Sequence, residues 1–161
     1  MTQNILELAK TQQSFLIQLN KKLKFYSLFK QDNKKSHYLD LIKNTNHQCT
    51  VATIRTSNHK LMIEYRRYCT PKIPEHLRLC QYCSINEIKD EQHLMLNCIT
   101  STKGNISLIL WVNPSFHSLS ANNMILFLFN NVDPFVSKEL GHFIFLAFEK
   151  RESLSLNITI I

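Results

Sequence analysis

Four residues near the middle of the chain have the types and the spacing of metal ligands. Cys80, Cys83, His93 and Cys98 follow the pattern C-x2-C-x9-H-x4-C. Two cysteines separated by two residues can both point into one tight turn, and a histidine with a third cysteine completes the tetrahedral ligand set of a structural Zn²⁺ site. The alternative is that these are buried thiols scattered along a chain in a reducing compartment. The combined spacing favours one zinc site.

The residues between the two ligand pairs predict a small β-hairpin followed by a short helix. Residues 84–89 have room for the hairpin, with Asn86 near its tip. Asp90 suits a helix N-cap, and Glu91 follows in the first turn, where the helix dipole favours an acidic side chain. This helix would carry His93 toward the cysteines.

Cys98 limits the length of that helix. It follows His93 by five residues, and at 3.6 residues per turn this offset places the two side chains on different faces of an α-helix. We therefore expect the helix to unwind or end near Asn97, so that both side chains reach the same ion. The expected unit is a ββα-like finger.

The residues around the ligands exclude a zinc deaminase. Such enzymes carry a Glu two residues after a His or Cys ligand, and a proline precedes their C-x-x-C. No H-x-E or C-x-E occurs in the chain, and Leu79 precedes Cys80.

The composition predicts a compact, mainly helical protein. Hydrophobic residues make up 44% of the 161 residues, with only two Gly and four Pro. Five cysteines without a signal-like N-terminus predict a reducing compartment, so we expect an intracellular protein, nuclear or cytoplasmic. The longest apolar runs, 124–129 and 143–148, are too short to cross a membrane. Cys49 and Cys69 lie outside the ligand pattern and are expected to be buried.

Apolar spacing and cap residues predict the helices. The expected segments are 2–30 as one or two amphipathic helices, 36–42 capped by Ser36, 46–59 capped by Asn46, 124–129 capped by Ser120, and 134–151 started by Asp133 and Pro134. The apolar stripe of the first segment, which includes Leu8, Phe15, Leu16 and Leu19, is expected in the core, and Phe135 is expected to point inward.

These elements give a mainly α fold, a helical domain with a small zinc-binding β-hairpin/helix finger. We expect three parts: a basic helical region over 1–78, the CCHC finger over 79–99, and a C-terminal helical region over 100–161. The last part is expected to pack on the rest as one domain, because no Gly-rich linker separates two domains.

Positive charge is concentrated in the first half of the chain. Residues 1–80 contain 14 Lys and Arg against 5 Asp and Glu, a net charge of +9, whereas residues 81–161 contain 5 against 7, a net of −2; together they give the +7 of the whole chain. Such asymmetry suits a surface that faces nucleic acid, because phosphate contacts supply most non-specific affinity. The lysines between 21 and 35 are explained equally well as the solvated side of a helix.

Residues 54–98 resemble the C-terminal region of non-LTR retrotransposon reverse transcriptases, which carries a zinc-binding CCHC segment. The family pattern combines R-x-x-x-H-x-L-x-I-E-x-G-R, I-P-R, R-x-C-x-x-C and E-D-E-x-H-x-x-x-x-C. The matching positions are Arg55, His59, Leu61, Ile63, Glu64, Arg67, Ile73, Pro74, Arg78, Cys80, Cys83, Asp90, Glu91, His93 and Cys98. The chain departs from the pattern at Arg66, Glu75 and Ile99, where the family has Gly, Arg and Pro. These departures affect the local backbone and leave the ligand set complete.

The resemblance implies a zinc-binding, nucleic-acid-binding C-terminal fragment of a retrotransposon reverse-transcriptase polyprotein, with RNA or DNA as partner and an intact retroelement polymerase as a second. No enzyme is expected, because the chain lacks the paired aspartates of a polymerase palm and the acid and histidine set of an endonuclease. Neither a membrane nor a small-molecule substrate is expected as a partner.

The basic residues next to the finger are the expected nucleic-acid contacts. They are Arg55, Lys60, Arg66, Arg67, Lys72 and Arg78. Arg78, beside the first cysteine, has a second explanation, because three thiolates and a neutral histidine leave a zinc site at −1 and a nearby cation offsets that charge. The alternative function is a zinc-stapled structural or protein-interaction module with no nucleic-acid binding. Salt-dependent binding to RNA or DNA would separate the two functions.

Overall fold

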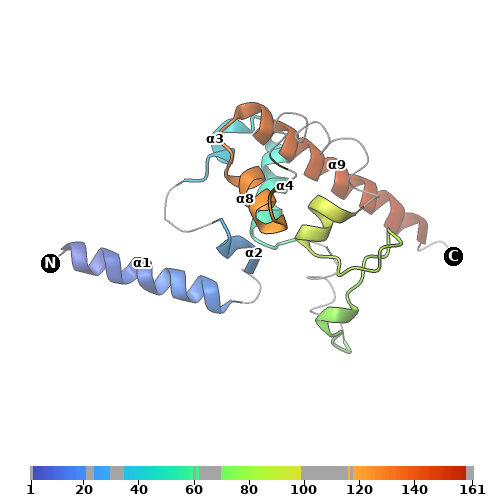
Figure 1. Cartoon of the computed structure of the whole chain (residues 1–161), viewed down its shortest axis with the longest axis horizontal. Coiled ribbons are helices and arrows are strands. Elements are labelled where there is room, and N and C mark those ends of the chain that lie inside the picture. The colour runs from blue at the N-terminus through green and yellow to red at the C-terminus, as the bar shows by residue number, and fades with distance from the viewer. Residues whose placement is uncertain are drawn as a thin grey trace.

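The structure is a computed structural model that describes residues 2–20, 24–29, 35–59, 61, 70–98, 116 and 118–158. It is mainly helical, as the sequence predicts, and these ranges contain no β-strand (Figure 1). In chain order the elements are α1 (Thr2–Leu19), α2 (Lys24–Ser27), α3 (Tyr38–Leu41), α4 (Thr45–Arg55), the 3₁₀ turn η2 (Glu75–Leu77), the π-helical turn η3 (His93–Asn97), α8 (Ala121–Asn130) and α9 (Pro134–Ile158). None of the described helices combines the length and the apolarity that a membrane span requires.

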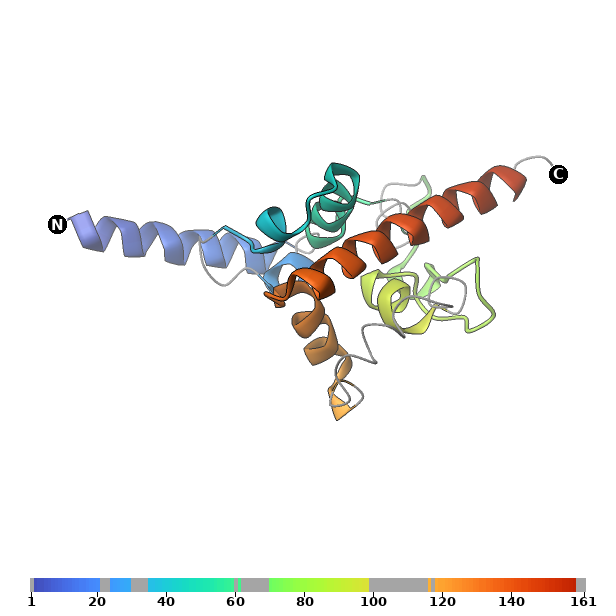
Figure 2. The same cartoon turned by 90° about the horizontal axis from the view of Figure 1, so that it is seen from above.

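The long helix α9 packs along α4, and this pair is the centre of the fold (Figures 1 and 2). Val51 and Ile54 of α4 are completely buried, as is Ile144 of α9. Gly141 permits the close approach of the two helices, because a Cβ at this position would lie 3.1 Å from the Cβ of His47. A side chain on α9 at this point would push the helices apart.

Side-chain caps set the start of three helices. Ser120 Oγ accepts a hydrogen bond from the backbone N–H of Asn123 at 3.4 Å, and Asp133 Oδ1 accepts one from Phe135 at 2.8 Å, so both predicted caps are confirmed. The prediction for α4 is wrong by two residues. Asn44 Oδ1, rather than Asn46, accepts the free N–H groups at the start of that helix.

Helix α9 differs from the sequence prediction in its length and at one buried position. It continues to Ile158, beyond the expected end near Arg151. Phe135, expected in the core, is exposed, whereas Val136, one residue later, is buried. The first turn of α9 therefore faces the core through a different residue.

Helix α1 corrects a further prediction, because its apolar stripe is not part of the core. It extends away from the other helices in both views (Figures 1 and 2), and Leu8, Phe15, Leu16 and Leu19 are all exposed. The expected N-terminal contribution to the core comes from Phe25 in α2 and from Phe29 just after it, since both contact Phe129 of α8. Cys49 is exposed as well, against expectation, and Cys69 lies outside the described residues.

Candidate metal centre

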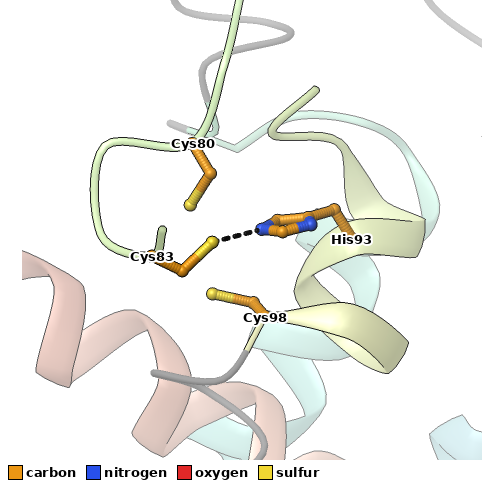
Figure 3. Close-up of side chains that lie close together, drawn as sticks. All are labelled: Cys80, Cys83, His93 and Cys98. Carbon is orange, nitrogen blue, oxygen red and sulfur yellow. Dashed lines mark hydrogen bonds between the residues drawn. The ribbon is translucent and has the colours of Figure 1, made fainter. Parts of the chain in front are cut away.

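The four residues of the C-x2-C-x9-H-x4-C pattern come together in the structure. The Sγ atoms of Cys80, Cys83 and Cys98 and a ring nitrogen of His93 lie within 4.8 Å of one another (Figure 3). Cys80, His93 and Cys98 are buried, and Cys83 is half-buried. This arrangement of soft donor atoms could bind a metal ion.

The loop that carries Cys80 and Cys83 differs from the predicted hairpin. In the described segment 70–98 the only β-pairing is an isolated antiparallel bridge between Leu79 and Ile88. The backbone N–H of Cys80 donates to the carbonyl of Glu87 at 2.9 Å, which closes the loop behind the sulfurs. Asn86 has a φ of +54°, a conformation that asparagine tolerates better than most residues. The loop therefore curves around the two cysteines instead of forming a β-ladder.

A π-helical turn brings His93 and Cys98 to the same side of the backbone. The backbone N–H of Cys98 donates to the carbonyl of His93 at 2.7 Å, the five-residue bond that defines a π-helix. A π-turn is wider than an α-turn, so residues five apart lie close to one face. Asp90 Oδ1 accepts from the N–H of His93 at 2.8 Å, which confirms the predicted cap. The helix ends at Asn97, as expected, but its widening was not predicted.

The same turn anchors the site in the hydrophobic core. Leu94 and Met95 follow His93 in η3 and are completely buried among the core residues. Their burial fixes the position of η3, and with it the direction of the His93 ring.

Glu87 orients the imidazole of His93, a role that was not predicted from the sequence. Glu87 Oε2 lies 3.0 Å from His93 Nδ1 and accepts a second hydrogen bond from Asn97 Nδ2 at 2.9 Å. The hydrogen bond with His93, followed by that with Asn97, lowers the pKa of Glu87. A carboxylate on Nδ1 keeps the proton there and leaves Nε2, 3.3 Å from Cys83 Sγ, free to bind a metal.

Two of the three cysteines, Cys80 and Cys98, are buried, and buried cations lie in the same part of the structure. Burial raises the pKa of Cys80 to about 11, so a metal ion is the group that would deprotonate this thiol. Arg151, from α9, is 5% exposed and donates from Nη2 to Cys98 Sγ at 3.0 Å. Lys89 is buried too, with Nζ 3.9 Å from the ring centre of Tyr82. Neither cation was predicted from the sequence to lie at the site.

A buried polar cluster joins the end of α4 to the metal centre. Glu91 Oε1 accepts from Ser57 Oγ at 2.6 Å and lies 2.9 Å from His59 Nε2. Burial acts to raise the pKa of Glu91, but the hydrogen bonds from His59 and Ser57 outweigh it, and the pKa is lowered overall. The carboxylate lies between the serine and the histidine, so Ser57 does not have the imidazole neighbour that a serine nucleophile requires. The cluster therefore links the segment after α4 to the residues just before η3, and its role is structural.

Two of the six expected nucleic-acid contacts are buried. Arg55 is 4% exposed, and its Nη1 donates to the carbonyl of Phe129 at 3.0 Å. Arg78 is 6% exposed, and its Nε donates to the carbonyl of Ile73 at 3.0 Å. These burials correct the prediction for both residues, because a phosphate cannot reach a buried guanidinium. Lys72 is exposed, and Lys60, Arg66 and Arg67 lie outside the described residues.

The chain matches no protein-family model, no curated protein and no solved structure. The resemblance of residues 54–98 to a reverse-transcriptase segment therefore stays an expectation from the sequence. The candidate site is defined by its own geometry.

Proposed function

We propose that Cys80, Cys83, His93 and Cys98 bind one structural Zn²⁺ ion, and that the protein is a zinc-stabilised nucleic-acid-binding module. By resemblance, it corresponds to the C-terminal region of a non-LTR retrotransposon reverse transcriptase and has no catalytic site of its own. The observation that carries the proposal is the convergence of four soft donor atoms within 4.8 Å.

The donor set favours zinc over other metals. Thiolates select Zn²⁺, Cu⁺ and iron–sulfur clusters, and three thiolates with one imidazole form a common structural zinc site. Zn–S bonds of about 2.3 Å and a Zn–N bond of about 2.0 Å place tetrahedral ligand atoms about 3.5–3.8 Å apart. The four atoms therefore need to move inward by only about 1 Å or less from the observed 4.8 Å limit. Four protein ligands leave no open position for a substrate, which indicates a structural ion.

Nucleic acid is proposed as the partner because of the positive charge of the chain and the resemblance of residues 54–98 to a reverse-transcriptase segment. The N-terminal half has a net charge of +9, and Lys72 is exposed near the loop of the site. RNA or DNA is the proposed partner, with an intact retroelement polymerase as a second partner. A reducing intracellular compartment is proposed because the site requires free thiols.

The alternative function is a zinc-stapled interaction module that binds no nucleic acid. The burial of Arg55 and Arg78 favours this alternative, because two of the six residues expected to contact nucleic acid form hydrogen bonds inside the protein instead. Both functions share the zinc site and differ only in what the surface binds.

The test combines metal analysis with a titration. The purified, reduced protein should contain one equivalent of zinc, and its affinity for single-stranded RNA and for duplex DNA should fall steeply between two salt concentrations. A folded protein without zinc would refute the metal site. A zinc-loaded protein with no salt-dependent binding would refute the nucleic-acid function and leave the interaction module.

A further inference from the structure

The proposed zinc centre has a charge that its surroundings must balance. Three thiolates and a neutral imidazole around Zn²⁺ carry a net charge of −1. Two of the sulfurs belong to buried residues, Cys80 and Cys98. A buried charge is costly unless it is paired and hydrogen-bonded, so a cation that reaches the centre inside the protein would stabilise it.

Arg151 is in the position to supply that cation. It comes from α9, which passes the loop and η3 in both views (Figures 1 and 2), and its Nη2 donates to Cys98 Sγ at 3.0 Å. The guanidinium is charged at any physiological pH and can donate five hydrogen bonds. Its Nε and Nη1 are buried and have no hydrogen-bond partner among the described residues.

Burial of the Arg151 guanidinium is unfavourable as long as the sulfurs are neutral thiols. Among the described residues its recorded contacts are the ring of Tyr82, 5.7 Å from Cζ, and the sulfur of Cys98. Neither carries a negative charge while the thiols are protonated, and a neutral thiol is a weak acceptor. When a metal ion replaces the thiol protons, the same guanidinium lies beside a negative centre. The guanidinium and the metal–thiolate centre have opposite charges, so each lowers the free-energy cost of burying the other.

We propose that Arg151 is the counter-ion of the zinc–thiolate centre and couples metal binding to the docking of the C-terminal half of α9. This inference rests on the proposed zinc site. Arg151 is a positioning residue, because it contacts a ligand sulfur and not the ion. Thermodynamic linkage requires the coupling to be reciprocal: zinc stabilises the docked helix by the same factor by which the docked arginine tightens zinc binding.

Three variants test the role of Arg151. Arg151→Gln removes the charge, Arg151→Lys keeps it without the planar fork, and Lys150→Gln removes an exposed charge one residue earlier on the same helix. Chelator competition should show that Arg151→Gln binds zinc about 10-fold to 100-fold more weakly, the usual range for a group that contacts a metal ligand. Arg151→Lys should be intermediate, and Lys150→Gln should match the wild type.

A spectroscopic signature separates the counter-ion from a simple packing role. With Co²⁺ in place of zinc, the sulfur-to-cobalt charge-transfer band reports on the electron density of the thiolates. Loss of the N–H···S hydrogen bond in Arg151→Gln should shift this band to lower energy, whereas a residue that only fills space would leave it unchanged.

Amide hydrogen exchange on the wild-type protein tests the coupling without any variant. Zinc should slow exchange in α9 around residues 147–154 as well as in the loop and η3. A folded Arg151→Gln protein with wild-type zinc affinity and an unchanged cobalt band would overturn the inference while leaving the zinc site in place. Exchange in α9 that does not respond to zinc would also overturn it. A wild-type protein that binds no zinc would refute the proposed site and this inference together.

Discussion

The backbone N–H of Cys98 donates to the carbonyl of His93 at 2.7 Å, and this five-residue hydrogen bond widens the last turn before the third cysteine. In a regular α-helix these two side chains would point to different faces. The π-turn removes that conflict, so two ligands of the candidate site come from one short helical segment. The other two come from a single loop, and only 19 residues, Cys80 to Cys98, contain the whole set.

Replacement of a proposed ligand should unfold the region around the site. Cys98→Ser should lose the stoichiometric zinc and much of a stabilisation that is on the order of 10 kcal/mol for structural zinc sites. Cys49→Ser is the matched control, because Cys49 is exposed and outside the cluster. Metal analysis and thermal unfolding followed by circular dichroism measure both effects. Equal zinc content in the two variants would contradict the assignment of Cys98.

Arg55 should affect stability rather than nucleic-acid binding. Its guanidinium lies 4.7 Å from the ring centre of Phe29 and donates to the carbonyl of Phe129. Arg55→Ala leaves that carbonyl unpaired and removes the cation–π contact, so we expect a loss of about 2–4 kcal/mol in the free energy of unfolding. Urea denaturation measures it. Lys43→Ala, at an exposed position, should change stability by less than about 0.5 kcal/mol.

The remaining basic candidates should set the salt dependence of binding. Replacing Arg66, Arg67 and Lys72 together by Ala should weaken the binding of RNA or DNA to a similar extent across sequences. The slope of log affinity against log salt should become shallower by about one unit for each phosphate that the variant no longer binds. Filter binding over a range of salt concentrations tests this. A folded, zinc-loaded triple variant that binds as the parent does would exclude these three residues as the contacts.

Stability should fall between neutral and mildly acidic pH because of His47. Its ring stacks on His142, with centroids 5.3 Å apart and planes 4° from parallel. Burial first, and then the neighbouring His142, lower the pKa of His47 below its ordinary 6.5, while Glu139 acts in the opposite direction. A lowered folded pKa gives a stability contribution that is complete above about pH 6.5 and is lost as the pH falls toward the folded value.

His47→Gln should therefore flatten the pH dependence of stability between about pH 7 and 5. His76→Gln, which changes an exposed histidine, is the control and should leave the slope unchanged. Denaturation midpoints at several pH values give the comparison. Identical slopes for His47→Gln and the wild type would show that the stacked pair does not titrate in this range.

Gly141→Ala should destabilise the protein although alanine is the better helix former. The exchange gains up to about 1 kcal/mol of helix propensity. The new methyl carbon, however, would lie 3.1 Å from His47 Cβ and 3.2 Å from Ile42 Cδ1. His47 Cβ is attached directly to the backbone of α4, so the helices must separate, and overpacking of this kind costs about 1–3 kcal/mol. We expect a net loss near 1 kcal/mol, and a higher melting temperature would contradict it.

Some features that depend on neighbouring residues could be predicted from the sequence, although the cap of α4, the loop over residues 84–89 and the π-turn were not. The caps at Asp90, Ser120 and Asp133 bond to N–H groups two or three residues away, and the four ligands are close in the chain. The caps and the ligands can therefore be recognised from residue type and spacing alone. The mainly α class follows from the same local signals.

Features that depend on distant contacts could not be predicted. Cys98 and Arg151 are 53 residues apart, and a single arginine in a helical pattern gives no indication of a sulfur partner. The spacing of Leu8, Phe15 and Leu19 correctly indicates an amphipathic helix, but periodicity does not say whether another element covers the apolar side. Arg55 was misassigned because sequence alone does not distinguish a buried cation from an exposed one.

The separation in sequence between Cys98 and Arg151 also sets the order in which the two residues are synthesised. Synthesis proceeds from the N-terminus, so all four ligands are made before the arginine that contacts one of them. At about 5–20 residues per second, the 53 residues from Cys98 to Arg151 take roughly 3–10 s to add. All four residues of the proposed zinc site are therefore available in the nascent chain while α9 is still incomplete, and the contact between Arg151 and Cys98 can form only afterwards.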